Sequence, residues 1–415
     1  MKLPEAAGAA GALAAGLLIL APLGAVYVRH WFSAAFVLLV MLMLISFREW
    51  WPRLTSDETT RRILVLSIAF FLSYVLSASL NGWDSGSTRA LEREMRLLML
   101  APLAAFLAIL PSIRILGIGC LVAVFFTGAA VGYDHLVLDK GRDLGVYGPL
   151  FTGPACVLFL IGSLGYSLTV HSSLRRLTCL ALSFLTVAFV TSVTSRSAMV
   201  GLLIVLIGIT LLDARHRRFF LSLGSICVFG ILASQLLGEG SDGPSFLQGI
   251  LELTSYLEHE VTHMLGHNPV GATSVGARLE MFKASIFIFS ESPIFGIGPR
   301  NFMPAVLNLK EAGIIHPDMP TYHPHNIFLE ALVSKGLLGL SLFIALLSTI
   351  TRAVLRCSEL ARHLGLIFLS AVLVMMFTES AILIKNNFSS LFVLFLAAFL
   401  SDRLTSRAKN LNVSE

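Results

Sequence analysis

Residues 63–80 read ILVLSIAFFLSYVLSASL and contain no charged side chain. As an α-helix, a run of this length rises roughly 27 Å, close to the hydrocarbon thickness of about 30 Å in a typical bilayer. Arg61 and Arg62 stand immediately before it, where positive residues commonly flank a membrane span. This stretch therefore predicts a transmembrane helix, and much of the remaining chain repeats its pattern.

The whole chain shares this apolar character. Of its 415 residues, 56% are hydrophobic and 13% are charged, and the mean hydropathy is +0.82. A soluble core could not bury so much apolar surface, so membrane lipids are the expected surroundings. The formal net charge of +5 does not indicate a nucleic-acid partner, because Lys and Arg lie singly or in small clusters between the apolar runs. Of the five cysteines, four lie within apolar runs, so the pattern indicates neither a disulfide framework nor a zinc site built from cysteines.

We expect an all-α polytopic membrane protein with about twelve transmembrane helices and a large periplasmic loop that contains amphipathic helices. The predicted spans are 9–28, 31–47, 63–80, 97–110, 115–132, 151–170, 177–194, 198–212, 219–237, 336–351, 364–380 and 387–400. They divide the chain into helices 1–9 in residues 1–237, the loop in residues 238–335, and helices 10–12 with a cytoplasmic tail in residues 336–415. The first apolar run resembles a signal peptide, but we interpret it as a retained span, because its removal would leave an odd number of spans.

The distribution of charge orients these spans. Short connections rich in Lys and Arg alternate with longer connections that carry fewer of them. The basic connections lie near residues 48–62, 114, 175–176, 215–218, 352–362 and 403–409. By the positive-inside rule, these connections and both termini face the cytoplasm. The segments 81–96, 133–150 and 238–335 then face outward, into the periplasm of a Gram-negative cell.

The loop at 238–335 is the one segment long enough to form a substructure outside the membrane. Residues 246–265 and 278–289 carry apolar side chains at helical spacing, which predicts amphipathic helices on the bilayer surface. A break in the helical pattern then follows at Pro293, Gly296, Gly298 and Pro299. A loop of this length within a membrane protein is commonly functional.

The first cationic motif is Thr194-Ser195-Arg196-Ser197, between two predicted spans on the outward side. Either serine can cap the following helix, which puts Arg196 beside the positive end of the helix dipole. A cation there is unfavourable unless an anion joins it. Arg196 is therefore a candidate anion-binding residue, and the alternative is an arginine that reaches lipid phosphates.

The second cationic motif begins at Arg278 and runs to the glycine-rich turn before Arg300. Gly296 and Gly298 allow positive φ angles and exposed backbone N–H groups, which suits an anion-binding nest. The alternative is a plain Gly-Pro turn. The pattern is not a nucleotide-binding motif, because no strand precedes it.

The third motif, His323-Pro324-His325-Asn326, leads into the next membrane span. It places imidazole groups, which titrate near neutral pH, at the lipid boundary. Such a group can take a proton from a sugar hydroxyl. The alternative is that the His-Asn pair only caps the helix.

A fourth motif, His259-Glu260-Val261-Thr262-His263, matches the pattern H-E-x-x-H, in which two histidines on one helix face bind zinc and the glutamate acts as a base. The continuation found in metzincins is absent, so we expect an amphipathic surface helix without a metal. Two acidic residues near the outward side, Asp84 and Glu379, are left without a predicted role, and Lys385 lies close to the second in sequence.

The motifs together resemble those of the O-antigen ligase and polymerase superfamily. The resemblance is carried by S-R-S-A at 195–198, R-L-E-x-F at 278–282, S-P-I-F-G-I-G-x-x-N-F at 292–302, H-P-H-N-x-x-L-E at 323–330 and S-K-G-L-L-G-L at 334–340. It covers residues 190–345, whereas the earlier spans match in hydropathy alone. Many relatives carry a Trp near the position of Phe282 and an Asn-Pro pair within 142–154, so the subfamily is left open.

This resemblance implies a metal-independent glycosyltransferase without a cofactor, with its active site on the periplasmic face of the bacterial inner membrane. Its donor would be an undecaprenyl-diphosphate-linked glycan. The resemblance implies that Arg196 and Arg278 engage the diphosphate and that His325 is the catalytic base. Arg300, His323 and Asn326 are candidate supporting residues. Because a glycosyl diphosphate is already activated, the chemistry needs only a base for the acceptor hydroxyl and positive charge for the leaving group.

Within the superfamily, the single outward loop that ends in H-P-H-N and the lack of a large C-terminal extramembrane domain favour a ligase. Such an enzyme passes polysaccharide to a lipid A-core sugar. The alternatives within the family are a polymerase and a protein O-oligosaccharyltransferase. A membrane zinc metallopeptidase is an alternative from another class. A transporter or flippase is disfavoured, because the predicted spans contain almost no charged residues.

Overall fold

The computed structural model describes residues 8–28, 30–83, 85–138, 149–170, 172–194, 196–212, 274–317, 323–378 and 386–413. Within these ranges the chain forms helices and no strand, as the all-α prediction requires. The helices are α1 (Gly8–Leu23), α2 (Trp31–Ile45), α3 (Phe47–Ser56), α4 (Glu58–Leu80), α5 (Ser85–Leu98), α6 (Leu100–Leu107), α7 (Ser112–Leu136), α8 (Pro149–Ser167), α9 (Ser173–Thr194), α10 (Arg196–Leu212), α13 (Ser274–Glu291), α14 (Phe302–Glu311), α15 (Ile327–Val354), α16 (Glu359–Thr378) and α18 (Asn386–Val413).

Six of the described helices are long and apolar enough to cross a membrane, namely α4, α7, α9, α15, α16 and α18. A seventh crossing results if α2 and α3, which meet at an angle of 85°, are counted as one span. The shorter apolar helices α1, α8 and α10 coincide with three further predicted spans. The predicted span 219–237 lies outside the described residues. The chain is therefore built as a multi-pass membrane protein, and the predicted number of about twelve spans stays a prediction.

One predicted span is not a single helix. Residues 97–110 are divided between the end of α5 and the short helix α6, with Met99 between them. Pro102 accounts for a break here, because in a continuous helix its ring would clash with the carbonyl group of Leu98. In the first turn of a new helix, the missing N–H group of proline removes no hydrogen bond. The side chains of α6 are all buried, so its apolar composition reflects a packed interior position.

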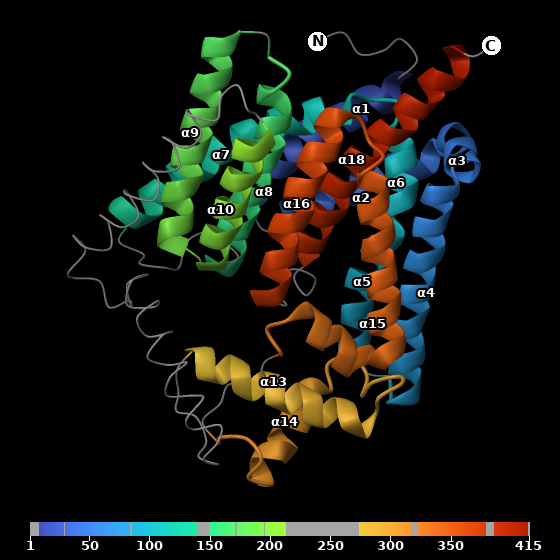
Figure 1. Cartoon of the computed structure of the whole chain (residues 1–415), viewed down its shortest axis with the longest axis vertical. Coiled ribbons are helices and arrows are strands. Elements are labelled where there is room, and N and C mark those ends of the chain that lie inside the picture. The colour runs from blue at the N-terminus through green and yellow to red at the C-terminus, as the bar shows by residue number, and fades with distance from the viewer. Residues whose placement is uncertain are drawn as a thin grey trace.

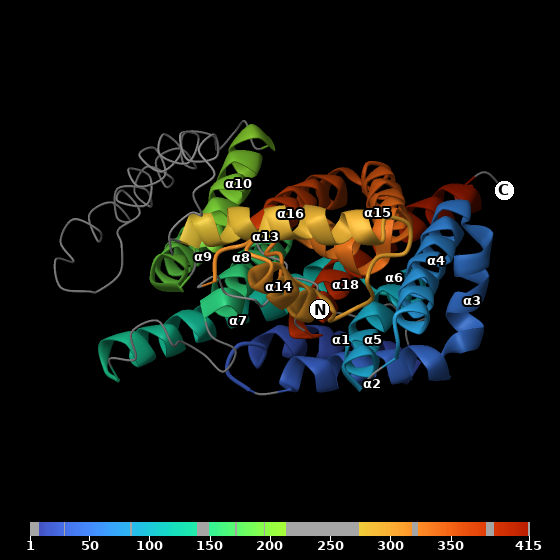
Figure 2. The same ribbon diagram turned by 90° about the horizontal axis from the view of Figure 1, so that it is seen from below.

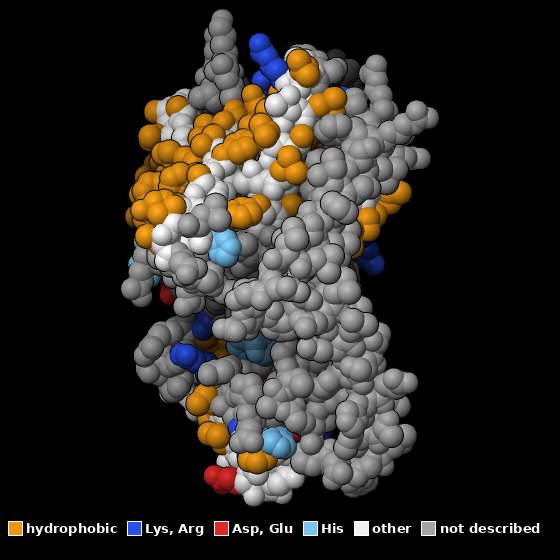
Figure 3. All heavy atoms as spheres, turned by 90° about the vertical axis from the view of Figure 1, so that its left-hand side faces the viewer, with side chains coloured by type: hydrophobic (Ala, Val, Ile, Leu, Met, Phe, Trp, Pro, Cys, Tyr) orange, Lys and Arg blue, Asp and Glu red, His pale blue; other side chains and the backbone are white. Residues whose placement is uncertain are grey.

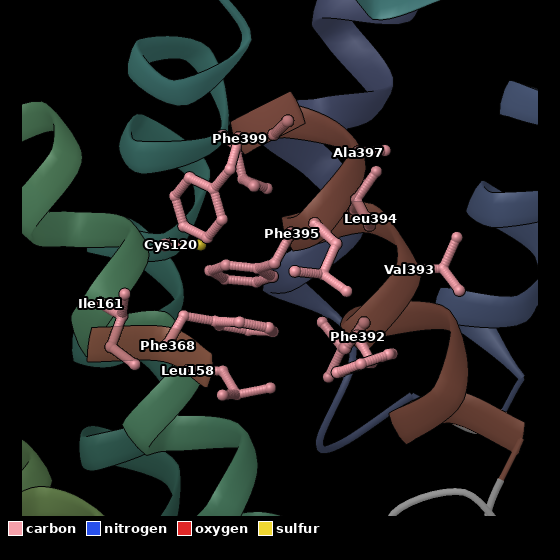
Figure 4. Close-up of a cluster of buried hydrophobic side chains, with 14 of the residues drawn as sticks. Cys120, Leu158, Ile161, Phe368, Phe392, Val393, Leu394, Phe395, Ala397 and Phe399 are labelled. Carbon is pink, nitrogen blue, oxygen red and sulfur yellow. The ribbon is translucent and has the colours of Figure 1, made fainter. Parts of the chain in front are cut away.

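The core of the bundle forms around α18, which lies in the middle of the surrounding helices when the molecule is seen from below (Figure 2). Phe392, Phe395 and Phe399 of α18 contact the ring of Phe368 from α16 (Figure 4). The rings of Phe368 and Phe395 are nearly parallel, with centroids 5.4 Å apart and an interplanar angle of 9°. Aromatic packing of this kind holds the central helix within the bundle.

Several basic connections lie together at one end of the bundle. Asp57, at the start of α4, accepts hydrogen bonds from Arg403 and Arg407 of α18. At the same end, the backbone N–H of Ser358 donates to Asp402, 3.0 Å away. These contacts bring the connections α3–α4 and α15–α16 next to the end of α18, as expected for segments that face the same side of a membrane.

A separate layer lies at the opposite end of the molecule, where α13 and α14 cross below the bundle (Figure 1). Its small core consists of Met281, Ala284, Ile288, Phe302, Val306, Leu309, Ile315 and Val333. The predicted helix 278–289 lies within α13, but its apolar side chains are not confined to one face, because Ile286 and Phe287 are exposed. The other predicted amphipathic helix, 246–265, lies outside the described residues.

Helix α15 is interrupted at Gly336, where φ is 65° and ψ is −164°. The turn 292–298 packs into this interruption through backbone hydrogen bonds. The N–H of Ile297 donates to the carbonyl of Val333 at 2.9 Å, and the N–H of Leu337 donates to the carbonyl of Pro293 at 2.8 Å. We refer to these paired segments, 292–298 and 333–338, as the Gly336 junction. A Cβ atom on Gly336 would collide with the carbonyl of Ile294, so this approach requires glycine.

Candidate functional site

Two histidines lie at the start of α15. The ring centroids of His323 and His325 are 4.2 Å apart, and both side chains are half-buried. His325 has a φ of 51°, in the left-handed region that costs a non-glycine residue about 1–2 kcal/mol. Such conformations persist where the surrounding structure imposes them, and they are concentrated at functional sites.

Asn326, the next residue, has a structural role. Its Oδ1 accepts hydrogen bonds from the backbone N–H groups of Phe328 and Leu329, at 2.9 and 3.1 Å. Its Nδ2 also donates to the carbonyl of Phe377 at 3.4 Å. Asn326 is therefore the N-cap of α15 and ties this helix to α16. Because the amide supplies the cap, the imidazole rings are not needed for it.

A cavity of about 540 Å³ opens beside the histidines, between α4, α5, α15 and the segment 299–303. Its size lies within the range of small-molecule sites, about 300–1,000 Å³. The acidic, basic and imidazole side chains among its described lining residues are Arg93, Glu94, Arg300, His323, Glu330 and Lys335. Two predicted supporting residues, Arg300 and His323, thus line one cavity. The sequence analysis did not predict Arg93, Glu94, Glu330 or Lys335 as part of a site.

The charged groups in the cavity are unevenly paired. The Nζ of Lys335 lies 2.7 Å from Oε1 of Glu94 and 3.9 Å from the ring centroid of Phe70. Arg93 and Arg300 form no hydrogen bond or ion pair with any described residue. Burial lowers the pKa of Arg93, the carboxylate of the neighbouring Glu94 raises it, and the Arg300 guanidinium lowers it. Among the described lining residues, three cations therefore face two carboxylates, and only the Lys335 cation is paired at hydrogen-bonding distance.

Glu330 lines the same cavity from α15. Its Oε2 atom is buried and has no hydrogen-bond partner among the described residues. A buried carboxylate oxygen without a donor is unfavourable and rare in folded proteins. This atom is therefore positioned for a donor that no described residue supplies.

The first half of the glycine-rich turn is engaged in the fold. The N–H of Gly296 donates to the carbonyl of Ser292 at 3.0 Å, and the N–H of Ile297 is used in the Gly336 junction. The carbonyl of Gly296 also accepts a hydrogen bond from Nδ2 of Asn81 at 3.0 Å. The N–H groups of Gly296 and Ile297 are therefore not open to an anion, and a nest at Gly298 remains a prediction. What this turn presents to the cavity is Arg300, whose φ is 66°.

The two arginines predicted to engage a diphosphate lie on different helices. Arg196 is the first residue of α10, but its side chain lies outside the described part of the structure. Arg278 lies on α13, is half-buried, and is not among the described residues that line the cavity. The convergence of these arginines with His325 remains a prediction.

A space-filling view shows the surroundings of this region (Figure 3). Among the described atoms of this face, hydrophobic side chains predominate in the upper left part, and Lys, Arg and His side chains are visible below them. Among the described residues, no group of three or more His, Cys, Asp or Glu side chains is arranged to hold a metal ion. The H-E-x-x-H segment at 259–263 lies outside those residues, as do Asp84, Glu379 and Lys385.

Sequence reasoning missed Arg93 and Glu94 because segment 81–96 was taken as a loop. A signal for α5 was nevertheless present. Residues 89–98 read RALEREMRLL, a run of helix-forming residues without Gly or Pro. That run predicts a helix, but nothing in it shows that Glu94 meets Lys335, which lies far along the chain.

A family model described as O-antigen ligase matches residues 179–344. No curated protein matches the chain. The matched segment contains Arg196, Arg278, Arg300, His325 and Glu330, whereas the helices α4 and α5, which form the other wall of the cavity, precede it.

Proposed function

Because this match places the chain in the O-antigen ligase superfamily, whose members are glycosyltransferase-like membrane enzymes, we propose that the protein is an O-antigen ligase. It would transfer polysaccharide from undecaprenyl diphosphate to a hydroxyl of a lipid A-core sugar. The observation that carries this proposal is the pair of histidines beside a cation-lined cavity, between the membrane helices α4 and α15, the helix α5 and the segment 299–303. A base and positive charge beside membrane-spanning helices suit a substrate with a lipid tail, a diphosphate and a sugar.

In the proposed reaction, His325 takes the proton of the acceptor hydroxyl, and the oxygen attacks the anomeric carbon of the donor sugar. The bond between that carbon and the diphosphate oxygen breaks as the new glycosidic bond forms. Arg196 and Arg278 stabilise the negative charge on the departing undecaprenyl diphosphate, since guanidinium groups stay charged and bind phosphate oxygens bidentately. The protein needs no cofactor in this scheme.

We also propose that residues 238–335 form the catalytic loop on the periplasmic side of the inner membrane. Two observations support this orientation. The basic residues Arg403 and Arg407 lie at one end of the bundle, and α13 and α14 lie at the other (Figure 1). By the positive-inside rule, the basic end faces the cytoplasm.

The test is transfer of glycan in membranes that contain single variants. We expect His325→Ala to lower the rate by about 10²–10⁴-fold, as for loss of a general base. His363→Ala is the matched control, because that histidine lies on α16 near the basic end of the bundle. Arg196→Ala and Arg278→Ala should each lower the rate, and EDTA should not. Full activity in His325→Ala, or loss of activity with the chelator, would overturn the scheme.

Deletion of the gene separates the alternatives. A ligase predicts loss of long-chain lipopolysaccharide with accumulation of lipid-linked polymer. A polymerase predicts that the lipid-linked glycan stays a single repeat, and a protein O-oligosaccharyltransferase predicts loss of glycoprotein instead. A metallopeptidase that uses His259, Glu260 and His263 predicts stoichiometric zinc in the purified protein.

A further inference from the structure

The cavity beside the histidines contains an unbalanced set of charges. Lys335 has its own carboxylate partner, Glu94, at 2.7 Å, whereas Arg93 and Arg300 have no such partner among the described residues. Arg93 is attracted by the carboxylates of Glu94 and Glu330 and repelled by Arg300. With three cations and two carboxylates in its described lining, the cavity keeps one positive charge in excess. An anion between the two arginines would neutralise this excess. Arginine is the residue best suited to a phosphate, because its planar group donates two parallel hydrogen bonds.

The backbone at Arg300 is held in a fixed conformation, which suits an anion-binding residue. Its left-handed φ of 66° is strained for a residue with a side chain. The turn that precedes it is fixed by the Gly336 junction and by Asn301, whose Nδ2 donates to the carbonyl of Ile297 at 2.7 Å. Arg300 therefore extends from a rigid support, which lowers the entropy lost when it binds a ligand.

The cavity contains groups and space that a phosphate ion alone would not contact. The buried Oε2 of Glu330 lacks a hydrogen-bond donor, and a sugar hydroxyl would supply one. Phe70, Tyr74 and Phe343 add apolar wall, and the rings of Phe70 and Phe343 stack with centroids 5.4 Å apart. A free phosphate would leave both the carboxylate oxygen and much of this space unused.

We propose that this cavity is a binding subsite for a phosphorylated sugar, with its phosphate held by Arg93 and Arg300 and one hydroxyl held by Glu330. The identity of its ligand as a substrate rests on the proposed function. Two sources carry this chemistry, namely the sugar diphosphate of the donor and a phosphorylated sugar in the acceptor lipid. His323 lines the cavity and contacts His325, so a ligand bound there would lie beside the proposed base.

The experiment measures binding to the purified full-length protein in detergent, with a hexose 1-phosphate, the same hexose without phosphate, and inorganic phosphate as probes. We expect saturable binding of the hexose phosphate, weakened at least tenfold in Arg93→Met and in Arg300→Met. Arg93→Lys and Arg300→Lys keep the charge but lose bidentate geometry, so they should bind with intermediate affinity. Arg62→Met is the matched control, because this exposed arginine lies at the basic end, and it should bind as the natural protein does.

Glu330→Gln distinguishes a sugar subsite from a simple phosphate site. It should weaken binding of the hexose phosphate and leave binding of inorganic phosphate unchanged. The proposal is wrong if the arginine variants bind the hexose phosphate normally while folded, as judged by a single peak in size exclusion. It is also wrong if phosphorylated and unphosphorylated hexose bind equally well.

Transfer assays then assign the source of the ligand. A raised KM for the lipid-linked donor in Arg93→Met assigns the cavity to the donor, and a raised KM for the acceptor lipid assigns it to the acceptor. The binding experiment tests the subsite, and the transfer assay of His325→Ala tests the proposed mechanism, so the two proposals can be refuted separately. Normal transfer in His325→Ala with the expected binding results would refute the proposed mechanism and leave the subsite standing, and the opposite pair of results would refute the subsite alone.

Discussion

The two ends of the molecule use charged residues in opposite ways. At the basic end, buried Asp57 accepts hydrogen bonds from Arg403 at 2.7 and 2.9 Å and from Arg407 at 2.6 Å. At the cavity, Arg93 and Arg300 form no hydrogen bond or ion pair with described residues. The first arrangement joins α4 to α18, whereas the second leaves cations facing an open space. We therefore expect the paired charges to stabilise the fold and the two arginines of the cavity to bind an anion.

The largest effect on stability is expected inside the cavity, at the ion pair between Lys335 and Glu94. Lys335→Met leaves the carboxylate of Glu94 partly buried without its partner, which should cost about 3 kcal/mol of stability. The double variant with Glu94→Leu should recover most of this loss, because an apolar pair can replace a buried ion pair. The melting temperature of the detergent-solubilised protein checks both. Equal melting temperatures for the single and the double variant would show that the pair is not coupled.

A smaller loss of stability is expected for Asp57→Asn at the basic end. Burial alone would raise the pKa of Asp57, but hydrogen bonds from Arg403 and Thr60 bring it down to about 2. A pKa below the ordinary value of 3.8 contributes roughly 2 kcal/mol at neutral pH. This contribution is present above about pH 4 and is lost as the pH falls through 2. The melting temperatures of the two proteins should therefore differ at pH 6 and converge near pH 2, and a constant difference would contradict this origin.

Arg93→Met should affect activity much more than stability, unlike the two variants above. Because it removes both the repulsion from Arg300 and the attraction of Glu94, we expect the free energy of unfolding to change by about 1 kcal/mol or less, as measured by thermal melting. Transfer of glycan should fall at least tenfold. If instead the variant is destabilised as much as Asp57→Asn and remains active, Arg93 is a structural residue and the contrast between the two ends is wrong.

The smallest effect is expected for Arg62→Ala. Arg62 forms an ion pair with Glu58 on the surface of α4, and both side chains are more than 60% exposed, at 69% and 65%. Water and salt screen such a pair, so stability should change by about 0.5 kcal/mol or less. A larger fall in melting temperature would mean that exposed pairs also join the helices of this bundle.

The sequence predicted well those features that depend on local composition. Apolar runs marked helices such as α4 and α7, because hydropathy and helix length act within one segment. The basic connections of α4 and α18 were placed on one side from charge alone, and Asp57 joins them. The cap at Asn326 was recognised as an alternative, since a cap is set by the residues next to it.

The features that were missed depend on contacts between distant segments. The separation of α5 from α6 follows from Pro102, which a count of apolar residues does not register. The interruption at Gly336 forms because the turn near Pro293 supplies carbonyl groups from elsewhere in the chain. In the same way, Arg93 becomes part of a cavity only when α5 meets α15. No pattern within residues 81–96 contains that information.

The Gly336 junction has a consequence for how the lower layer can vary. The hydrogen bonds between Pro293, Ile297, Val333 and Leu337 in it use main-chain atoms, which almost every amino acid carries. Side chains along α13 and α14 can therefore be exchanged during evolution while the angle of attachment to the membrane helix is preserved. The chemistry of this layer is thus separable from its attachment: substitutions on its surface change what it presents to a ligand without moving it relative to α15.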